Sequence, residues 1–175
     1  MPTQTVIKYD AILSLDPSGS FHEGKGTTGY CLMLADGTIE EINTICARQH
    51  TDAFSYFKAH VLLIEQLAMN YENLCVVMED YVLYANKAAS QVNSAMETCQ
   101  LLGVLKYVCD CSRIPWHIQK AAAVKTRWSD EVLLSKGILK KDKRGLMADG
   151  FKICKHEIDA IRHAMHFVTF YNKGE

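Results

Sequence analysis

Hydrophobic and polar residues alternate along the first part of the chain in a pattern typical of β-strands. Residues 10–16 alternate like a strand, and the run stops at Pro17-Ser18-Gly19. Two more strand-like runs, 28–34 and 39–45, flank Asp36-Gly37, a dipeptide typical of hairpin turns. We therefore expect three antiparallel strands at the start of the fold.

Helical spacing and one buried strand follow this hairpin. After a Thr51 or Asp52 cap, helical spacing runs to about Asn70, with apolar positions at Phe54, Phe57, Val61, Ile64 and Ala68. Residues 74–78 are wholly apolar, as in a central strand covered on both faces, and Glu79 comes directly after them. The pattern predicts a helix packed beside a central strand.

The second half of the chain predicts two long helices separated by a strand and a basic segment. The first helix covers about 88–108 and includes Gly103; the strand covers 114–118, where Pro115 indicates a sheet edge. Short helices are expected near 121–127 and 142–147, with a break at Gly137. The last helix begins near Cys154 and carries on one face Ile158, Ile161, Met165 and Val168.

This order of elements predicts an α/β fold with a five-stranded mixed sheet, three antiparallel strands followed by parallel ones, flanked by helices. We see no repeat or linker and expect one domain over residues 1–175. No apolar run approaches the roughly 20 residues that span a bilayer, and Met1–Lys8 has no leader pattern. We expect a soluble cytoplasmic protein with no membrane partner. The seven cysteines include no C-x-x-C pair and are expected to be reduced thiols rather than zinc ligands.

The charge of the chain is unevenly distributed. Residues 1–110 hold 6 basic and 13 acidic side chains, whereas residues 111–155 hold 11 basic and 4 acidic ones. A basic segment beside an acidic body suits a polyanion held next to a metal-binding carboxylate cluster. The alternative is a solvated helical face.

Four residues are candidates for a metal site. Asp16 and Glu79 each follow an apolar strand that the topology places at the centre of the sheet, where ligand sites of α/β folds collect. His156 and Asp159 are three residues apart and share one face of the last helix. Three carboxylates and an imidazole meet the needs of two-metal phosphodiester hydrolysis. Taken singly, each acid is more often a turn residue, and their neighbours Asp80 and Glu157 are expected to project elsewhere.

Three segments of the chain resemble the RuvC family of Holliday-junction resolvases, in the ribonuclease H-like superfamily, and particularly its phage members. They are L-S-L-D-P-S-G-S with the following G-T-T-G-Y, V-V-M-E-D-Y-V-L-Y-A-N-K-A-A-S, and H-E-I-D-A-I-R-H-A. Family members carry acids on the first and fourth strands and D-x-x-D or H-x-x-D on the last helix. These positions correspond to Asp16, Glu79, His156 and Asp159.

The resemblance implies a homodimer that makes paired nicks in four-way and other branched DNA. It also implies two Mg²⁺ ions per active site, for which Mn²⁺ substitutes, and it places the 88–108 helix near the two-fold axis. The catalytic-loop lysine of the family matches Lys141 or Lys143, and Lys143 joins the catalytic candidates. Val82 stands where cellular members carry a phenylalanine. Whether a branch-migration complex is a partner stays open.

Basic and aromatic residues near these motifs are the candidates for DNA contact. They are Tyr81, Tyr84, Lys87, Lys120, Lys125, Arg127, Lys136, Lys140, Lys141, Lys143 and Arg144. Three alternatives remain at this point. One is a ribonuclease H acting on RNA–DNA hybrids, another is a non-catalytic junction-binding dimer, and the third, suggested by Asp16-Pro-Ser-Gly-Ser, is an actin-like ATPase, which needs roughly twice this length.

Overall fold

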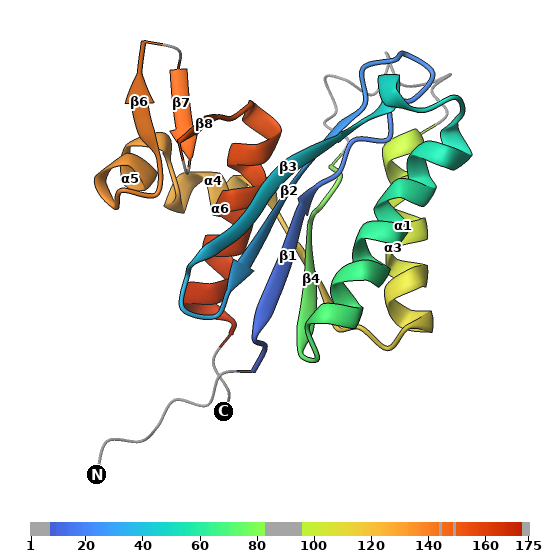
Figure 1. Ribbon diagram of the computed structural model, residues 1–175, viewed down its shortest axis with the longest axis horizontal. Helices are drawn as coiled ribbons and strands as arrows, with labels where there is room; N and C mark the ends of the chain where they lie inside the picture. The colour runs from blue at the N-terminus through green and yellow to red at the C-terminus, as the bar shows by residue number, and fades with distance from the viewer. Residues whose placement is uncertain (1–7, 83–95, 144, 149, 173–175) are drawn as a thin grey trace.

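The computed structural model describes residues 8–82, 96–143, 145–148 and 150–172, and its centre is a five-stranded mixed sheet with helices on both faces (Figure 1). The strand order is β3-β2-β1-β4-β5. β1 (Ala11–Asp16), β2 (Thr27–Leu34) and β3 (Ile39–Cys46) are antiparallel neighbours, whereas β4 (Leu74–Glu79) runs parallel to β1, and β5 (Trp116–Gln119) runs parallel to β4 at the sheet edge. The fold class predicted from the sequence is confirmed, including the edge position of the strand that follows Pro115.

One face of the sheet is covered by α1 (Ala53–Asn70) and α3 (Glu97–Cys111) (Figure 1). The cap of α1 is Asp52, whose carboxylate accepts a hydrogen bond of 2.6 Å from the Ser55 amide. The buried positions of α1 are Tyr56, His60, Ile64 and Leu67, so the predicted face was wrong at Phe54, which is 77% exposed. The N-terminal part of the predicted 88–108 helix lies outside the described residues, and its end extends to Cys111.

The opposite face is covered by α6 (Lys155–Phe170), with α4 (Ala121–Arg127) and α5 (Asp130–Ser135) packed beyond it (Figure 1). Helices α4 and α6 match the sequence prediction. The chain breaks at Gly137, which has a φ of 72°, as expected for a residue that leaves helical geometry.

The predicted helix over 142–147 is wrong. This segment belongs to a small three-stranded antiparallel sheet of β6 (Lys140–Asp142), β7 (Gly145–Ala148) and β8 (Phe151–Lys152). Gly145 and Gly150 have φ of 124° and 82°, values that suit hairpin turns and interrupt a helix. Met147 and Ala148 are buried, Ala148 packs in the same core cluster as Ile158 and Ile161 of α6, and that packing favours the strand.

Alternation along the strands decides which residues face α6. On β1 and β4, Leu13, Leu15, Val76 and Met78 belong to the core under α1 and α3, whereas the intervening Ile12, Cys75 and Val77 pack with Phe167 of α6. Asp16 and Glu79 continue the second series at the ends of the two strands. Among the described residues, no helix is both long and apolar enough to cross a membrane.

Candidate active site

The candidate active site lies at the carboxyl ends of the parallel neighbours β1 and β4. Asp16 ends β1 and Glu79 ends β4, and both contact histidines of α6. Both line a cavity of about 140 Å³, together with Pro17, Asp80, Tyr81, Val82, Thr98 and Ala121. The structure therefore brings these two predicted acids together. Asp80 also lines the cavity, whereas the sequence analysis predicted that its side chain projects elsewhere.

Asp16 forms a close pair with His156 at the start of α6. The His156 Nδ1 atom lies 2.6 Å from Asp16 Oδ2. Burial raises the pKa of Asp16, the hydrogen bond from His156 opposes that rise, and the nearby negative charges of Glu79 and Asp159 add to it. The same hydrogen bond raises the pKa of His156. We conclude that the pair holds a proton between them when no other cation is present.

Gly29 allows this pair to form. It lies opposite Asp16 in the β1–β2 ladder, and a Cβ atom there would lie 2.2 Å from the backbone carbonyl carbon and oxygen of His156. Such a contact is impossible without moving the helix, so any side chain at this position would displace the start of α6. The second glycine of G-T-T-G-Y thus has a specific role, namely close approach of α6 to β2.

Glu79 is held by two donors. His163 Nε2 lies 2.9 Å from Glu79 Oε2, and Lys125 Nζ lies 3.3 Å from the same oxygen and 3.4 Å from Oε1. Burial opposes ionisation of Glu79. The hydrogen bond from His163, with the charge and hydrogen bond of Lys125, outweighs burial and holds the pKa of Glu79 below its usual range. Glu79 is therefore an ionised, oriented carboxylate.

Asp159 lies one helical turn after His156 and has a cation at each oxygen. Lys125 Nζ is 3.0 Å from Oδ2, and Arg162 Nη1 is 2.5 Å from Oδ1. Arg162 is itself anchored, because its Nε donates to the Trp128 carbonyl at 2.8 Å and its Nη2 contacts Asp130. Since the Asp159 side chain is only 3% exposed, these contacts supply the compensation that a buried carboxylate needs.

Lys125 is the cation that joins the two acidic halves of the site. Burial opposes its charge, but Asp159 and Glu79 outweigh burial and raise the pKa of Lys125 above its usual value. Its ammonium group occupies the space between two carboxylates that would otherwise repel each other. The sequence singled out Lys125 as a DNA contact, and its place among the acids was not predicted.

The donor set has the chemistry that a divalent metal needs. Asp16, Glu79 and Asp159 offer hard oxygen ligands, and their mutual repulsion is part of the reason the pKa of Asp16 is raised. Within the described ranges, however, no three acidic, histidine or cysteine side chains are already grouped around one point. Lys125 and His156 instead provide the positive charge, and both lie where a cation could replace them. The residues therefore fit a divalent cation by their chemistry.

Three contributors to the site were missed by sequence reasoning: Arg162, His163 and Gln119. His163 follows Asp159 by four residues and so lies on the same helical face, a spacing that could have pointed to it. Gln119 ends β5 and pairs in register with Glu79, so it is the third polar residue at this edge of the sheet. The His163 spacing is readable from the sequence, whereas the Gln119 signal is visible only once the strand order is known.

The predicted DNA contacts are widely separated in the structure. Tyr81 lines the cavity, and Lys120, at the cap of α4, is exposed. Arg127 lies over the Phe170 ring at 4.7 Å, and Lys136 lies over the Trp128 ring at 5.8 Å. Three further candidates are exposed on β6 and its turn, namely Lys140, Lys141 and Lys143, whereas Tyr84, Lys87 and Arg144 lie outside the described residues.

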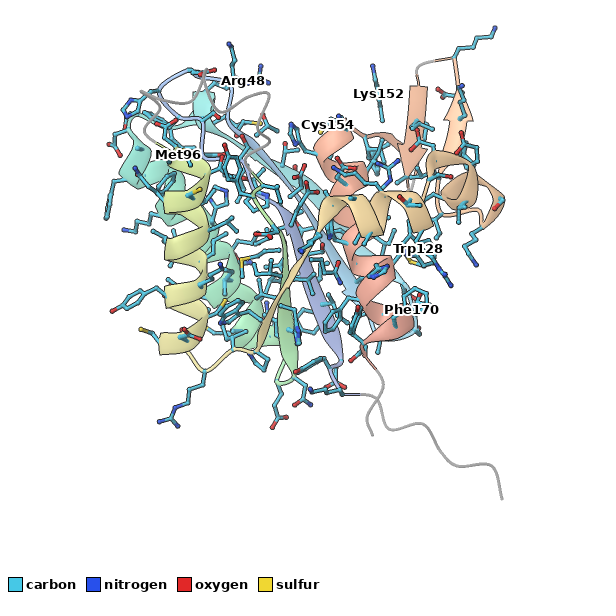
Figure 2. All side chains as sticks on the ribbon, turned by 180° about the vertical axis from the view of Figure 1, so that it is seen from behind. Arg48, Met96, Trp128, Lys152, Cys154 and Phe170 are labelled. Atoms are coloured by element: carbon cyan, nitrogen blue, oxygen red, sulfur yellow. The ribbon has the colours of Figure 1, made fainter. Side chains whose placement is uncertain are left out.

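The Arg127 contact lies far from the carboxylates. Cys154 and Phe170 mark the two ends of α6 in Figure 2, and His156 is near the first of these ends. Phe170 follows His156 by 14 residues, which corresponds to about 21 Å along a helix. Lys143 lies in the exposed turn after β6, and in the described part of the chain the carboxylates are contacted by Lys125 instead.

Comparison with known proteins gives structural likeness without sequence likeness. No family model and no curated protein matches the sequence. The structure of Thermus thermophilus RuvC in complex with a Holliday junction substrate matches with a TM-score of 0.66 at 12% identity, covering 94% of this chain and 98% of that one. A second structure of Thermus thermophilus RuvC matches with a TM-score of 0.60 at 15% identity, covering 93% and 98%. The chain therefore has a RuvC-like fold.

Proposed function

We propose that this protein is a divalent-metal-dependent endonuclease that resolves four-way junctions and other branched DNA by paired nicks, as a phage-type member of the RuvC family. One observation carries the proposal. Two carboxylates at the ends of parallel strands, Asp16 and Glu79, line one cavity of a RuvC-like sheet, and Lys125 contacts both Glu79 and the Asp159 carboxylate of α6. One of the similar structures is bound to a Holliday junction. The resemblance of the sequence motifs to that family supports the same assignment.

Each residue of the site has a proposed task. Asp16, Glu79 and Asp159 supply the oxygen ligands, and His156, which is hydrogen-bonded to Asp16 at 2.6 Å, either ligates or orients the Asp16 carboxylate. Lys125 withdraws from the carboxylates when another cation arrives and is then free to contact the DNA backbone. Arg162 keeps one oxygen of Asp159 fixed, and the other oxygen faces the ammonium group of Lys125.

The proposed cofactor is Mg²⁺, with Mn²⁺ as a substitute and two ions per site. When bound, such ions activate a water molecule and stabilise the leaving oxygen of the phosphodiester. The three carboxylates would hold them. The homodimer and its two coordinated sites are part of the proposal and rest on the family resemblance. The expected cytoplasmic location, in a bacterium or a phage-infected host, stays a prediction.

A substrate comparison tests the proposal. Purified protein is incubated in Mg²⁺ with a synthetic four-way junction, a linear duplex of the same arm sequence, and an RNA–DNA hybrid. We expect symmetric nicks in the junction and none in the duplex. Cleavage of the hybrid strand without junction cleavage would instead identify a ribonuclease H. Junction binding with no nicking in either Mg²⁺ or Mn²⁺ would identify a non-catalytic binding protein.

A further inference from the structure

His163 is a fully buried ionisable side chain of α6 and is in direct contact with the candidate active site. It is 0% exposed, yet both of its ring nitrogens have polar partners from two different strands. Nε2 lies 2.9 Å from Glu79 Oε2, and Nδ1 lies 2.8 Å from the side-chain amide of Gln119. The three side chains thus form a hydrogen-bonded series, from Gln119 on β5 through His163 on α6 to Glu79 on β4.

The direction of hydrogen bonding along this series follows from the partners. An ionised carboxylate can only accept, so the His163 Nε2–H donates to Glu79. Gln119 is 92% buried, and in the orientation with Oε1 toward His163 its Nε2 has no partner among the described groups. Exchanging the two ends of the amide, which occupy equivalent positions, lets Nε2 donate to His163 Nδ1. In both hydrogen bonds, from Gln119 to His163 and from His163 to Glu79, the hydrogen then points toward Glu79.

We propose that Gln119 and His163 are positioning residues that hold the Glu79 carboxylate in the orientation needed to ligate a divalent cation. The inference rests on the proposed function in that Glu79 is taken as a ligand. Gln119 fixes the ring of His163 and its protonated nitrogen, and His163 then fixes one Glu79 oxygen. Among the described residues, the partner of the other oxygen, Oε1, is the Lys125 ammonium at 3.4 Å, and this is the oxygen that we take as available to a cation.

Fixing one oxygen matters because a glutamate has three rotatable bonds, and a cation site needs its oxygen at a defined place. Hydrogen-bond partners of metal ligands commonly change metal affinity or activity by roughly 10- to 100-fold when removed. Asp159 has a corresponding arrangement, since Arg162 holds one oxygen at 2.5 Å and Lys125 contacts the other. The site therefore has two carboxylates, each with one rigid and one exchangeable partner.

The test measures Mn²⁺ affinity by calorimetry on the full chain without DNA, and the Mg²⁺ dependence of junction nicking. His163→Leu removes the donor at similar volume, His163→Gln retains a donor, and Gln119→Leu removes the distal partner. His166→Leu is the matched control, because His166 is on the same helix and packs against Phe170 and Tyr171 instead of the carboxylates. Junction affinity is measured in EDTA for each variant.

We expect His163→Leu to weaken Mn²⁺ binding and to raise the Mg²⁺ needed for half-maximal nicking by about 10-fold or more. Gln119→Leu should weaken Mn²⁺ binding and raise the required Mg²⁺ concentration by a smaller factor. His163→Gln should lose less Mn²⁺ affinity than His163→Leu, and His166→Leu should behave as wild type. Junction affinity in EDTA stays unchanged throughout. These results separate positioning from a general loss of structure.

Unchanged Mn²⁺ affinity in His163→Leu overturns the inference, as does an equal loss in His166→Leu. Should His163→Leu fail to fold, Gln119→Leu decides, and wild-type Mn²⁺ affinity in that variant overturns the inference. The outcome is distinct from that of the proposed function. A wild-type protein that binds Mn²⁺ but never nicks a junction removes the proposed function, while weakened Mn²⁺ binding in His163→Leu still supports the inference.

Discussion

Each face of the sheet buries one histidine completely, and the two histidines differ in what they touch. His60, on the α1 face, contacts Thr28 Oγ1 at 2.8 Å and the Tyr56 carbonyl at 2.9 Å, both uncharged. His163, on the α6 face, contacts a carboxylate. Both are 0% exposed. Burial alone therefore does not distinguish a structural histidine from one that serves a site; the charge of the partner does.

The His60 contacts determine which ring nitrogen carries the hydrogen in the neutral form. A carbonyl can only accept, so Nδ1–H donates to Tyr56, and Nε2 accepts the hydroxyl hydrogen of Thr28. Burial is the main cause that lowers the pKa of His60 to about 4. Thr28 in turn accepts from the Ser18 amide at 3.1 Å, so this neutral network holds the loop that follows Asp16. The α1 face supports the site through uncharged groups, and the α6 face supplies the charges.

The largest expected effect is at the close contact between the α6 face and β2. Gly29→Ala should lower junction nicking by about 100-fold or more, since a small displacement of α6 separates His156 from Asp16. The overlap should also reduce the free energy of unfolding by about 1–3 kcal/mol. Both are measured on one preparation, by nicking rate and by denaturant unfolding.

Gly103→Ala is the matched control for the stability of the single chain, and not for nicking, because its helix is expected near the two-fold axis. A Cβ at Gly103 meets nothing within 4 Å in the described chain, and alanine is a better helix former than glycine. We expect the free energy of unfolding to rise by about 0.5–1 kcal/mol. An active Gly29→Ala protein with wild-type stability would show that α6 does not need this close approach.

On the α1 face, we expect His60 to make the free energy of unfolding depend on pH. Because the folded pKa of His60 is about 4 and its usual value is 6.5, the unfolded state binds a proton first as the pH falls. The stability from neutral His60 is fully present above pH 6.5 and is lost between pH 6.5 and 4, by about 3 kcal/mol. Denaturant unfolding across this range should show that the free energy of unfolding of wild type, relative to His60→Gln, falls by that amount. A difference that does not change with pH would contradict the assignment of His60 as neutral.

Variants of Lys125 and His163 should change Mn²⁺ affinity in different directions. Lys125→Met should slow nicking by roughly 10- to 100-fold, because a charged partner of two ligands is lost. Since Lys125 competes with an added cation for Glu79 and Asp159, the Mn²⁺ affinity of Lys125→Met should equal or exceed that of wild type. His163→Leu, in contrast, should lower it. Lys143→Met is the comparison, because Lys143 is exposed in the turn after β6. A larger loss of nicking in Lys143→Met would return the catalytic role to that residue.

The smallest expected effect concerns the exposed basic residues. Lys141 is exposed on β6, whereas Arg127 packs on the Phe170 ring at the far end of α6. Lys141→Ala should reduce the slope of log affinity against log salt by about 0.9, the value for one phosphate contact. Arg127→Ala should leave it unchanged. Equal slopes for the two variants and wild type would exclude β6 from the DNA surface.

The strands and most long helices could be predicted because local patterns determine them. The alternation that ends at Asp16, the apolar run that ends at Glu79, and the cap at Asp52 are all readable without tertiary information. The 142–147 segment was not, because four or five residues with two nearby glycines have no decisive period. There, packing of Leu146 and Ala148 against the α6 side favours strands over a helix.

The candidate site was predictable in its acids and not in their partners. Asp16, Glu79 and Asp159 were predicted from strand ends and a helical motif; in the structure Asp16 and Glu79 line one cavity, and Lys125 contacts both Glu79 and Asp159. Lys125 was read only as part of a basic segment, and His163 and Gln119 were not singled out. Their role depends on which strands are neighbours and which face each residue occupies, and the strand order β1-β4-β5 supplies that information.

The most direct test of the account is junction nicking by Asp16→Asn and Glu79→Gln beside wild type, with junction binding measured on the same samples. Each variant keeps the size of the side chain and removes one negative oxygen from the cavity. We predict that both bind the junction with near wild-type affinity and that neither nicks it in Mg²⁺ or Mn²⁺. Nicking at the wild-type rate by either variant would contradict the assignment of the active site.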